Sequence, residues 1–503
     1  MLFSSLTFLF IFLPLVLLIY FISKDKYKNI ILLIFSLIFY AYGEPKYIVL
    51  MLFSIILNYF VALLIDKYHS NKNKAKLFLI LDITINLLLL VLFKYTNLII
   101  NTINDVFKIN IDKLTIFNID ILKLTLPIGI SFYTFQLISY VIDVYRKDVK
   151  VQKNIFSLGT YVAFFPQLIA GPIVRYETIE QELKHRTHSF DKFVSGFKRF
   201  IIGLGKKVII ANNVAFIADQ IIDSQYFTSY GTGVIWIAMI AYTLQIYFDF
   251  SGYSDMAIGL GKIFGFTFLE NFNYPYISKS ITDFWRRWHI SLSSWFRDYV
   301  YIPLGGNRVK KSRWIINIFI VWALTGLWHG ASWNFMLWGL YYGIILVFEK
   351  LFLKKFLEKS PNFIRWLYSI ILIIIGWTIF RIEDISLLGE TLHKMIIFEK
   401  TNWLEFIRLN YHLVSYSIYL VLGIIFMFPW FENYIKKANN NQGIIHALNN
   451  LFILLIFIIS ILFLIKDTYN PFIYFRFWLL FIKFERKNTY EKYICYWLYR
   501  LHR

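Results

Sequence analysis

Long apolar runs separated by short polar segments dominate the sequence. Residues 2–22 carry no charged side chain, and Asn58 is the obvious polar break within residues 47–65. A helix rises about 1.5 Å per residue, so roughly 20 apolar residues cross the hydrocarbon core of a bilayer. The pattern therefore predicts an all-α polytopic membrane protein with about ten to twelve helices. Further apolar helices are expected at residues 30–42, 77–93, 234–248, 314–328, 333–348, 366–380, 416–430 and 451–465.

The connections between the first helices alternate in charge. Residues 23–29 and 66–76 are rich in lysine, whereas residues 43–46 are nearly neutral. Basic connections remain on the cytoplasmic side, so we expect the N-terminus outside. The first apolar run is too long for the core of a signal peptide and is expected to remain as a helix. Residues 96–123 are mixed in charge, which predicts an outside loop with room for a short surface element.

Proline residues interrupt two apolar runs in the middle of the chain. Pro127 falls within residues 124–145, and Pro166 and Pro172 fall within residues 161–173. Proline removes a backbone donor and bends a helix. Irregular backbone at membrane depth persists only where protein or a water-filled cavity covers it. These breaks predict re-entrant or broken helices around a central tunnel.

Several segments lack the pattern of a free membrane span. Residues 177–207 are charged but have helical apolar spacing, which predicts an amphipathic helix at the inner interface. Residues 273–313 are basic and rich in tryptophan, so we expect them at the cytoplasmic surface. Residues 432–442 are expected to form a polar loop. The segment 479–503 is expected to be an appended basic and aromatic tail, outside a single transmembrane domain of residues 1–478.

Charge and cysteine content exclude several classes of function. The net charge is +21, but the basic residues lie in short connections rather than in a basic domain, which argues against nucleic acid as a partner. The bilayer, with its anionic lipids, is the expected partner of these connections. Cys495 is the single cysteine of the 503 residues, so an internal disulfide or a cysteine-based metal site is excluded. We expect no metal centre.

Two histidines lie beside tryptophans in this apolar chain. His289 follows Trp288 in the basic segment, and His329 follows Trp328 at the end of the uncharged residues 314–328. Polar groups in a membrane are costly and usually serve a pathway or a reaction. Burial favours neutral imidazole, which is a suitable general base near neutral pH. The alternative is that each histidine is hydrogen-bonded and only fixes helix packing.

The segment of residues 247–255 offers two carboxylates beside hydroxyl groups. One functional interpretation is that Asp249 or Asp255 orients a histidine or pairs with Arg286 or Arg287. Aspartate and serine at this point also suit the cap of a following helix. We favour the capping and pairing role.

Four segments together carry a resemblance to a known family: residues 126–132, 164–172, 284–308 and 325–334. With these segments the chain resembles the membrane-bound O-acyltransferase family, most closely its bacterial alginate O-acetylation branch. The resemblance implies a multi-helix fold with a tunnel through a thin centre. It also implies that His329 matches the family's catalytic histidine and that His289 matches the second polar residue of the catalytic pair.

The resemblance further implies a reaction. An acetyl group passes from a cytoplasmic donor, acetyl-CoA or another acetyl thioester, across the membrane to a cell-surface polysaccharide such as an alginate-like exopolysaccharide or peptidoglycan. An extracytoplasmic acetyltransferase partner and a bacterial cytoplasmic membrane are expected, and no tightly bound cofactor. The residues expected to bind substrate are Arg286 and Arg287, which suit donor phosphates, together with Trp285, Trp328, Asn334 and Gln167.

Two other functions remain open at this point. The same fold in a related branch of the family transfers D-alanine to teichoic acid. A polysaccharide or lipid transporter, with the histidines relaying protons, is an alternative from another class. No internal repeat is evident, which disfavours a transporter built from repeated halves.

Overall fold

The structure is a computed structural model that describes residues 1–116, 119–430, 442–466 and 470. Within these residues the fold is helical, apart from a hairpin of two short antiparallel strands in which Thr115 pairs with Asp120. In the described part of the chain, seven helices are long and apolar enough to cross a membrane, and two shorter apolar helices accompany them. The chain is therefore an all-α multi-pass membrane protein, as the apolar pattern predicts.

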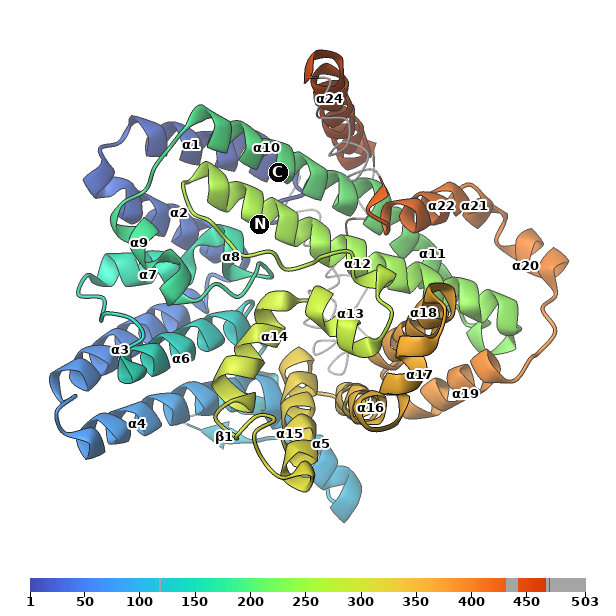
Figure 1. The fold of residues 1–503 in the computed structure, drawn as a ribbon, viewed down its shortest axis with the longest axis horizontal. Helices are drawn as coiled ribbons and strands as arrows, with labels where there is room; N and C mark the ends of the chain where they lie inside the picture. The colour runs from blue at the N-terminus through green and yellow to red at the C-terminus, as the bar shows by residue number, and fades with distance from the viewer. Residues whose placement is uncertain (117–118, 431–441, 467–469, 471–503) are drawn as a thin grey trace.

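The N-terminal helices pack at one side of the molecule, coloured blue in Figure 1. Helix α4 continues without interruption through a π-helical turn, η3, into α5. The expectation of a loop from residue 96 is therefore wrong for its first part, because Thr96–Phe107 extends this helix. The elements of this part are η1 (Phe8–Phe12), α1 (Leu13–Ile22), η2 (Asp25–Tyr27), α2 (Lys28–Gly43), α3 (Ile48–Lys67), α4 (Lys72–Leu90), η3 (Val91–Tyr95), α5 (Thr96–Phe107), β1 (Thr115–Ile116), β2 (Ile119–Asp120) and η4 (Ile121–Lys123).

The expected backbone breaks occur in the middle of the chain. After α6 (Ile130–Arg146) and α7 (Ile155–Ala163), the short α8 (Phe165–Leu168) leads into a non-helical stretch that is buried. Gly129 precedes α6 with φ of +77°, and a Cβ atom there would lie 2.7 Å from the carbonyl oxygen of Leu168. Glycine is therefore required where the two breaks meet. Covered irregular backbone is what the prolines predict.

One predicted interfacial helix is instead buried in the fold. Residues 177–207 divide into α9 (Tyr176–Lys184) and α10 (Phe190–Gly205), and α10 continues through η5 (Lys206–Ala211) into α11 (Asn212–Ile222). This continuous helix is a candidate membrane span. It lies along α12 (Thr232–Ile263), which crosses the centre of Figure 1 and follows the short η6 (Phe227–Ser229). The interfacial prediction is therefore wrong.

Glycines and ion pairs explain this burial. A Cβ on Gly203 would lie 2.5 Å from the carbonyl oxygen of Gly252, so the two helix backbones touch. Small residues permit such close approach between membrane helices. Three of the charges that suggested an interface are paired with carboxylates of α12: Arg199 and Lys206 with Asp255, and Lys207 with Asp249 at 2.8 Å.

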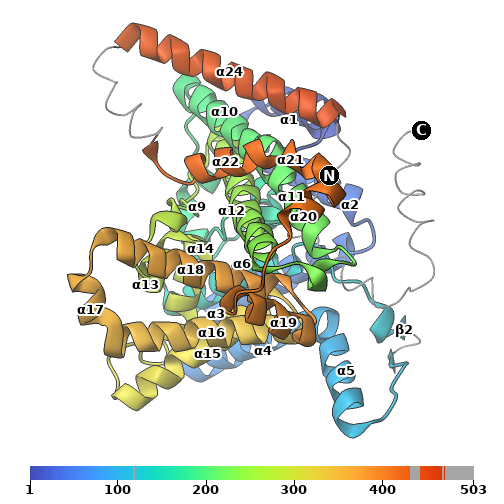
Figure 2. The same cartoon turned by 90° about the vertical axis from the view of Figure 1, so that its right-hand side faces the viewer.

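The C-terminal half forms a second group of helices around the end of α15. Figures 1 and 2 show α13 beside α16 and α18, and α18 itself packs against α12. The predicted spans 314–328 and 366–380 fall inside α15 and α18. The elements are η7 (Pro275–Ile277), α13 (Ile281–Arg287), α14 (Ile290–Phe296), η8 (Arg297–Tyr301), α15 (Lys311–His329), α16 (Trp333–Phe348), η9 (Glu349–Leu353), α17 (Lys354–Lys359), α18 (Asn362–Arg381), α19 (Ile385–Ile396), α20 (Trp403–Leu409), α21 (Tyr411–Val414), α22 (Ser417–Phe426) and α24 (Gln442–Lys466). The predicted polar loop, except Gln442, and the tail after residue 478 lie outside the described residues.

Candidate functional site

His329 is the last residue of α15, at a tight connection to α16. Asn334 fixes this connection, because its side-chain nitrogen donates to the carbonyl oxygens of Ile379 and Phe380 at 3.3 and 3.0 Å. These two carbonyls belong to the end of α18, so one buried amide joins the two helix ends. These hydrogen bonds fix the start of α16, just after His329, to the end of α18.

Aromatic rings surround the His329 imidazole. The ring centroids of Trp328 and Trp338 lie 5.0 Å away, and that of Phe380 lies 5.3 Å away. All three rings stand nearly perpendicular to the imidazole, which is the edge-to-face arrangement that aromatic pairs prefer. The His329 side chain is half-buried. Its ring is therefore held in an apolar pocket while part of it stays accessible.

His289 lies between α13 and α14, in the left-handed backbone region with φ of 45°. It is 1% exposed, and its Nδ1 lies 3.1 Å from the side-chain oxygen of Asn271. That oxygen also accepts hydrogen bonds from the Ser291 amide and hydroxyl, and an amide oxygen cannot donate. Nδ1 therefore carries the proton, and Nε2 is left as the acceptor. Among the described residues, Nε2 is buried without a hydrogen-bond partner.

Burial determines the charge of His289. This residue lies outside the candidate membrane spans, and burial lowers the pKa of its imidazole to about 3. The ring is therefore neutral near pH 7. A neutral imidazole with an unpartnered acceptor nitrogen suits contact with a hydroxyl, a thiol or an amide donor.

The two histidines meet through Trp328. The His289 ring centroid lies 5.7 Å from the Trp328 ring, and the His329 centroid lies 5.0 Å from it. Trp328 also packs on Phe132 of α6, at 5.2 Å. Three residues that the sequence singles out, from two distant segments, are thus brought into one aromatic cluster.

The other predicted substrate-binding residues differ in their placement. Trp285 lies in the aromatic cluster next to His329, since its ring centroid is 5.5 Å from that of Trp338, which contacts His329. Arg287 is committed to an ion pair with Asp283 at 3.0 Å, whereas Arg286 is exposed. Gln167 is fully buried. Its side-chain nitrogen donates to the carbonyl oxygen of Tyr161 and so stabilises the connection of α7 to α8.

Asp249 and Asp255 both lie inside α12, so neither caps a helix. The capping expectation is therefore wrong. Both carboxylates form ion pairs, but the expected partners, Arg286 and Arg287, are not the observed ones. Asp255 accepts from Arg199 and Lys206 at 2.8 and 2.7 Å, and Asp249 pairs with Lys207. These contacts fasten α10 and η5 to α12.

Lys94 and Tyr95, which sequence reasoning missed, contact the last turn of α15. The Lys94 ammonium donates to the carbonyl oxygen of Trp328 and, at 3.2 Å, to the Ser131 hydroxyl. The Tyr95 hydroxyl donates to the Leu327 carbonyl oxygen at 2.6 Å. The sequence signal for these residues is a lysine that follows an apolar run. A lysine is common at the end of a membrane helix, so this signal does not mark a functional residue.

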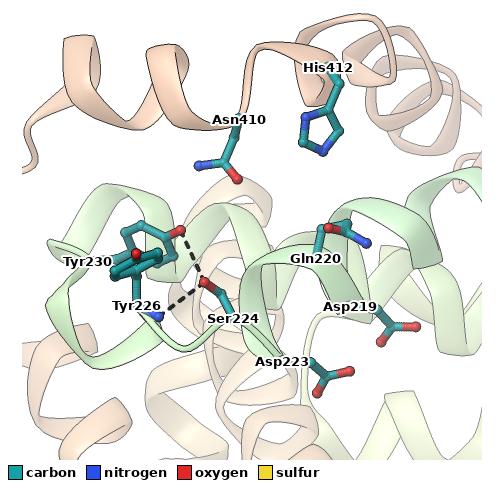
Figure 3. Close-up of a pocket in the computed structure, with 8 residues that line it drawn as sticks. All are labelled: Asp219, Gln220, Asp223, Ser224, Tyr226, Tyr230, Asn410 and His412. Atoms are coloured by element: carbon teal, nitrogen blue, oxygen red, sulfur yellow. Dashed lines mark hydrogen bonds between the residues drawn. The ribbon is translucent and has the colours of Figure 1, made fainter. Parts of the chain in front are cut away.

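A polar cavity of about 350 Å³ lies beside the C-terminal end of α11 (Figure 3). In that view Asn410 and His412, near α21, face Gln220 and Ser224 across the cavity. Arg381 pairs with two of its carboxylates, Asp219 at 3.3 Å and Asp223 at 2.9 Å. Arg381 directly follows Phe380, whose ring packs on His329. The ion pairs beside the cavity therefore adjoin the histidine site along the chain.

Among the residues that the structure describes, no group of three or more His, Cys, Asp or Glu side chains is placed to hold a metal ion.

Comparison with known proteins decides the family. The sequence profile of the membrane-bound O-acyltransferase family matches residues 34–382. This chain belongs to that family. The membrane-bound O-acyltransferase match includes His289 and His329, and it confirms the resemblance seen in the sequence. The protein is a multi-pass membrane O-acyltransferase.

Named relatives of this O-acyltransferase modify different polymers. A probable alginate O-acetylase of Azotobacter vinelandii is 39% identical over 511 residues, covering 95% of this chain and all of the relative. A peptidoglycan O-acetyltransferase of Helicobacter pylori is 37% identical, covering 79% of this chain and 80% of the relative. A teichoic acid D-alanyltransferase of Bacillus subtilis is 33% identical, covering 48% of this chain and 62% of the relative.

Proposed function

We propose that this O-acyltransferase moves an acetyl group from a cytoplasmic thioester to a hydroxyl group of a cell-envelope polysaccharide. The observation that carries the proposal is the pairing of His289 and His329 across one indole, with His289 buried and neutral and His329 half-buried. The names of the O-acetylating relatives, which align over most of the chain, support acetyl as the acyl group.

In the proposed reaction His329 acts as the general base. Its imidazole takes the proton of the acceptor hydroxyl while the hydroxyl oxygen attacks the thioester carbonyl carbon. The carbon–sulfur bond then breaks, and the thiolate leaves with the electron pair and is protonated, so that an ester and a free thiol result. The rings of Trp328, Trp338 and Phe380 limit access of water, which would otherwise hydrolyse the thioester.

His289 would position the reactants on the donor side. Asn271 fixes its tautomer, so that Nε2 is presented as an acceptor for a hydrogen-bond donor on either substrate. The exposed guanidinium of Arg286 suits donor phosphates, whereas Arg287 is engaged by Asp283. The donor is acetyl-CoA or another acetyl thioester, and no tightly bound cofactor is required by this chemistry.

The proposed setting is the cytoplasmic membrane of a bacterium. The acetyl group would cross the thin centre of the protein and reach the polysaccharide directly or through an extracytoplasmic acetyltransferase partner. The acceptor is an alginate-like exopolysaccharide or peptidoglycan, in line with the substrates in the names of the relatives.

Transfer of D-alanine to teichoic acid is the second candidate, because a D-alanyltransferase shares 33% identity over half of the chain. One experiment separates the functions. Envelope esters are released by mild base from a strain lacking the gene and from the same strain carrying it, and are identified by mass. Gene-dependent acetate supports the proposal, and gene-dependent D-alanine replaces it with the second candidate. Loss of exported polymer, without loss of ester per polymer, indicates a transporter.

A further inference from the structure

Lys94 is a buried lysine in the middle of a long helix. Its side chain is 3% exposed, within a continuous apolar helix from Lys72 to Phe107. Among the described residues it has no ion pair. Its side-chain nitrogen donates hydrogen bonds to the carbonyl oxygen of Trp328 and the hydroxyl of Ser131, and it lies 6.0 Å from the centroid of the Trp328 ring. Transfer of a charged side chain into an apolar interior is costly, and such residues usually serve a function.

The surrounding backbone brings two neighbouring side chains to the same target. Lys94 and Tyr95 lie in the π-helical turn η3, and π-helical turns are frequent at functional sites. Lys94 holds the Trp328 carbonyl, and Tyr95 holds the Leu327 carbonyl. The carbonyl groups of a helix's last turn lack partners within the helix and carry partial negative charge, so an ammonium is well matched to them.

These two carbonyls belong to the residues that directly precede His329. The end of α15 is therefore held by hydrogen bonds from η3 on one side. On the other side, the His329 ring packs against Trp338 and Phe380. The position of the imidazole is fixed between these two sets of contacts.

We propose that Lys94 is a positioning residue for acyl transfer, which acts by holding the Trp328 carbonyl and so fixes His329 and the indole shared with His289. This inference rests on the proposed function of the histidine site. Lys94 acts through Trp328 and takes no part in bond making. A shift of about 1 Å in a reacting group costs on the order of 100-fold in rate, so loss of this contact should be visible in the reaction.

The test compares Lys94→Met with Lys94→Arg in a strain lacking the native gene. Methionine is similar in length and apolar, so it removes the charge without creating a large cavity, and arginine keeps the charge and the donors. Lys76→Met is the matched control, because Lys76 is an exposed lysine of α4, the helix that continues into η3. Gene-dependent envelope ester, protein level in the membrane and thermal unfolding in detergent are measured for each variant.

We expect Lys94→Met to lower ester formation by about 10- to 100-fold while membrane level and unfolding temperature remain those of the parent. Lys94→Arg should recover a measurable part of the activity, and Lys76→Met should match the parent. Parental activity in Lys94→Met overturns the inference. So does a loss that follows a parallel fall in protein level or unfolding temperature, or an arginine variant that is folded but no better than methionine.

Tyr95→Phe is a second variant that weakens the hydrogen bonds between η3 and the end of α15. It removes the hydroxyl that holds the Leu327 carbonyl and keeps the ring. We expect a smaller loss of ester than in Lys94→Met, because the Trp328 contact remains. His329→Ala separates the two proposals: if that variant is inactive while Lys94→Met and Tyr95→Phe are normal, the inference about Lys94 fails alone. If His329→Ala is active, the proposed function fails first.

Discussion

His289 and His329 lie on the same tryptophan, with ring centroids 5.7 and 5.0 Å from Trp328. The first residue comes from the connection of α13 to α14 and the second from the end of α15. The same indole packs against both imidazoles. Its size therefore affects how far apart the two imidazole rings lie. Trp328 is therefore the structural link between the two histidines.

Replacement of Trp328 by leucine should therefore separate the histidines from their common contact. We expect Trp328→Leu to reduce gene-dependent ester by about 10- to 100-fold, and Trp328→Phe to reduce it less, because phenylalanine keeps an aromatic face. Ester content per polymer is the measurement, with membrane level as the control. Equal activity of Trp328→Leu and the parent would show that the indole does not organise the site.

Stability below neutral pH should depend on His289. Its folded-state pKa is about 3 against an ordinary value of 6.5, so the unfolded chain binds a proton that the folded protein does not as pH falls through this interval. This group therefore adds to stability above pH 6.5 and removes stability as pH falls. We expect the unfolding temperature of His289→Gln to fall less between pH 7 and pH 4.5 than the unfolding temperature of the parent. The same loss in both proteins would mean that His289 is not buried in the neutral form.

The glycines between α10 and α12 should be intolerant of a methyl group. A Cβ at Gly203 would lie 2.5 Å from the Gly252 carbonyl oxygen, so Gly203→Ala should destabilise the protein by about 1–3 kcal/mol through forced separation of the helices. Gly389→Ala is the control, since no atom lies within 4 Å of a Cβ at that position in α19. Thermal unfolding in detergent should fall for Gly203→Ala and stay level or rise for Gly389→Ala. A fall of similar size in both would refute the close contact.

The ion pair of Lys207 and Asp249 should be sensitive to single substitution. Both side chains are buried, so Lys207→Met leaves a buried carboxylate without this partner and should cost about 3–5 kcal/mol. Replacement of both residues, as Lys207→Met with Asp249→Leu, should restore much of the unfolding temperature. A double variant as unstable as the sum of the two singles would show that the pair does not act as a unit.

The sequence predicted the class of the fold and the residues at its centre for clear physical reasons. Uncharged runs of helical length indicate membrane spans, and α15 was placed to within a few residues of its bounds, Lys311–His329. Prolines and glycines indicated the break at α8, because proline lacks the backbone donor that a helix needs and glycine permits a left-handed backbone. The tryptophans beside His289 and His329 marked the histidines that the structure brings to one indole.

Other features depend on partners far away in the chain. The charges of α10 suggest an interface until Arg199 and Lys206 are seen against Asp255, at 2.8 and 2.7 Å. The role of Lys94 is equally hidden, since Trp328 lies 234 residues further along the chain. Local pattern shows that a charge is present in an apolar run, but only the fold shows which group satisfies it.

The ester content of His329→Ala is the most direct test of the account. The variant is expressed in a strain lacking the native gene, beside His393→Ala, which alters an exposed histidine of α19. With both proteins at parental level in the membrane, we expect base-released acetate to fall to the level of the deletion strain for His329→Ala and to stay parental for His393→Ala. Parental acetate in the His329→Ala strain would contradict the central claim that this imidazole carries out acyl transfer.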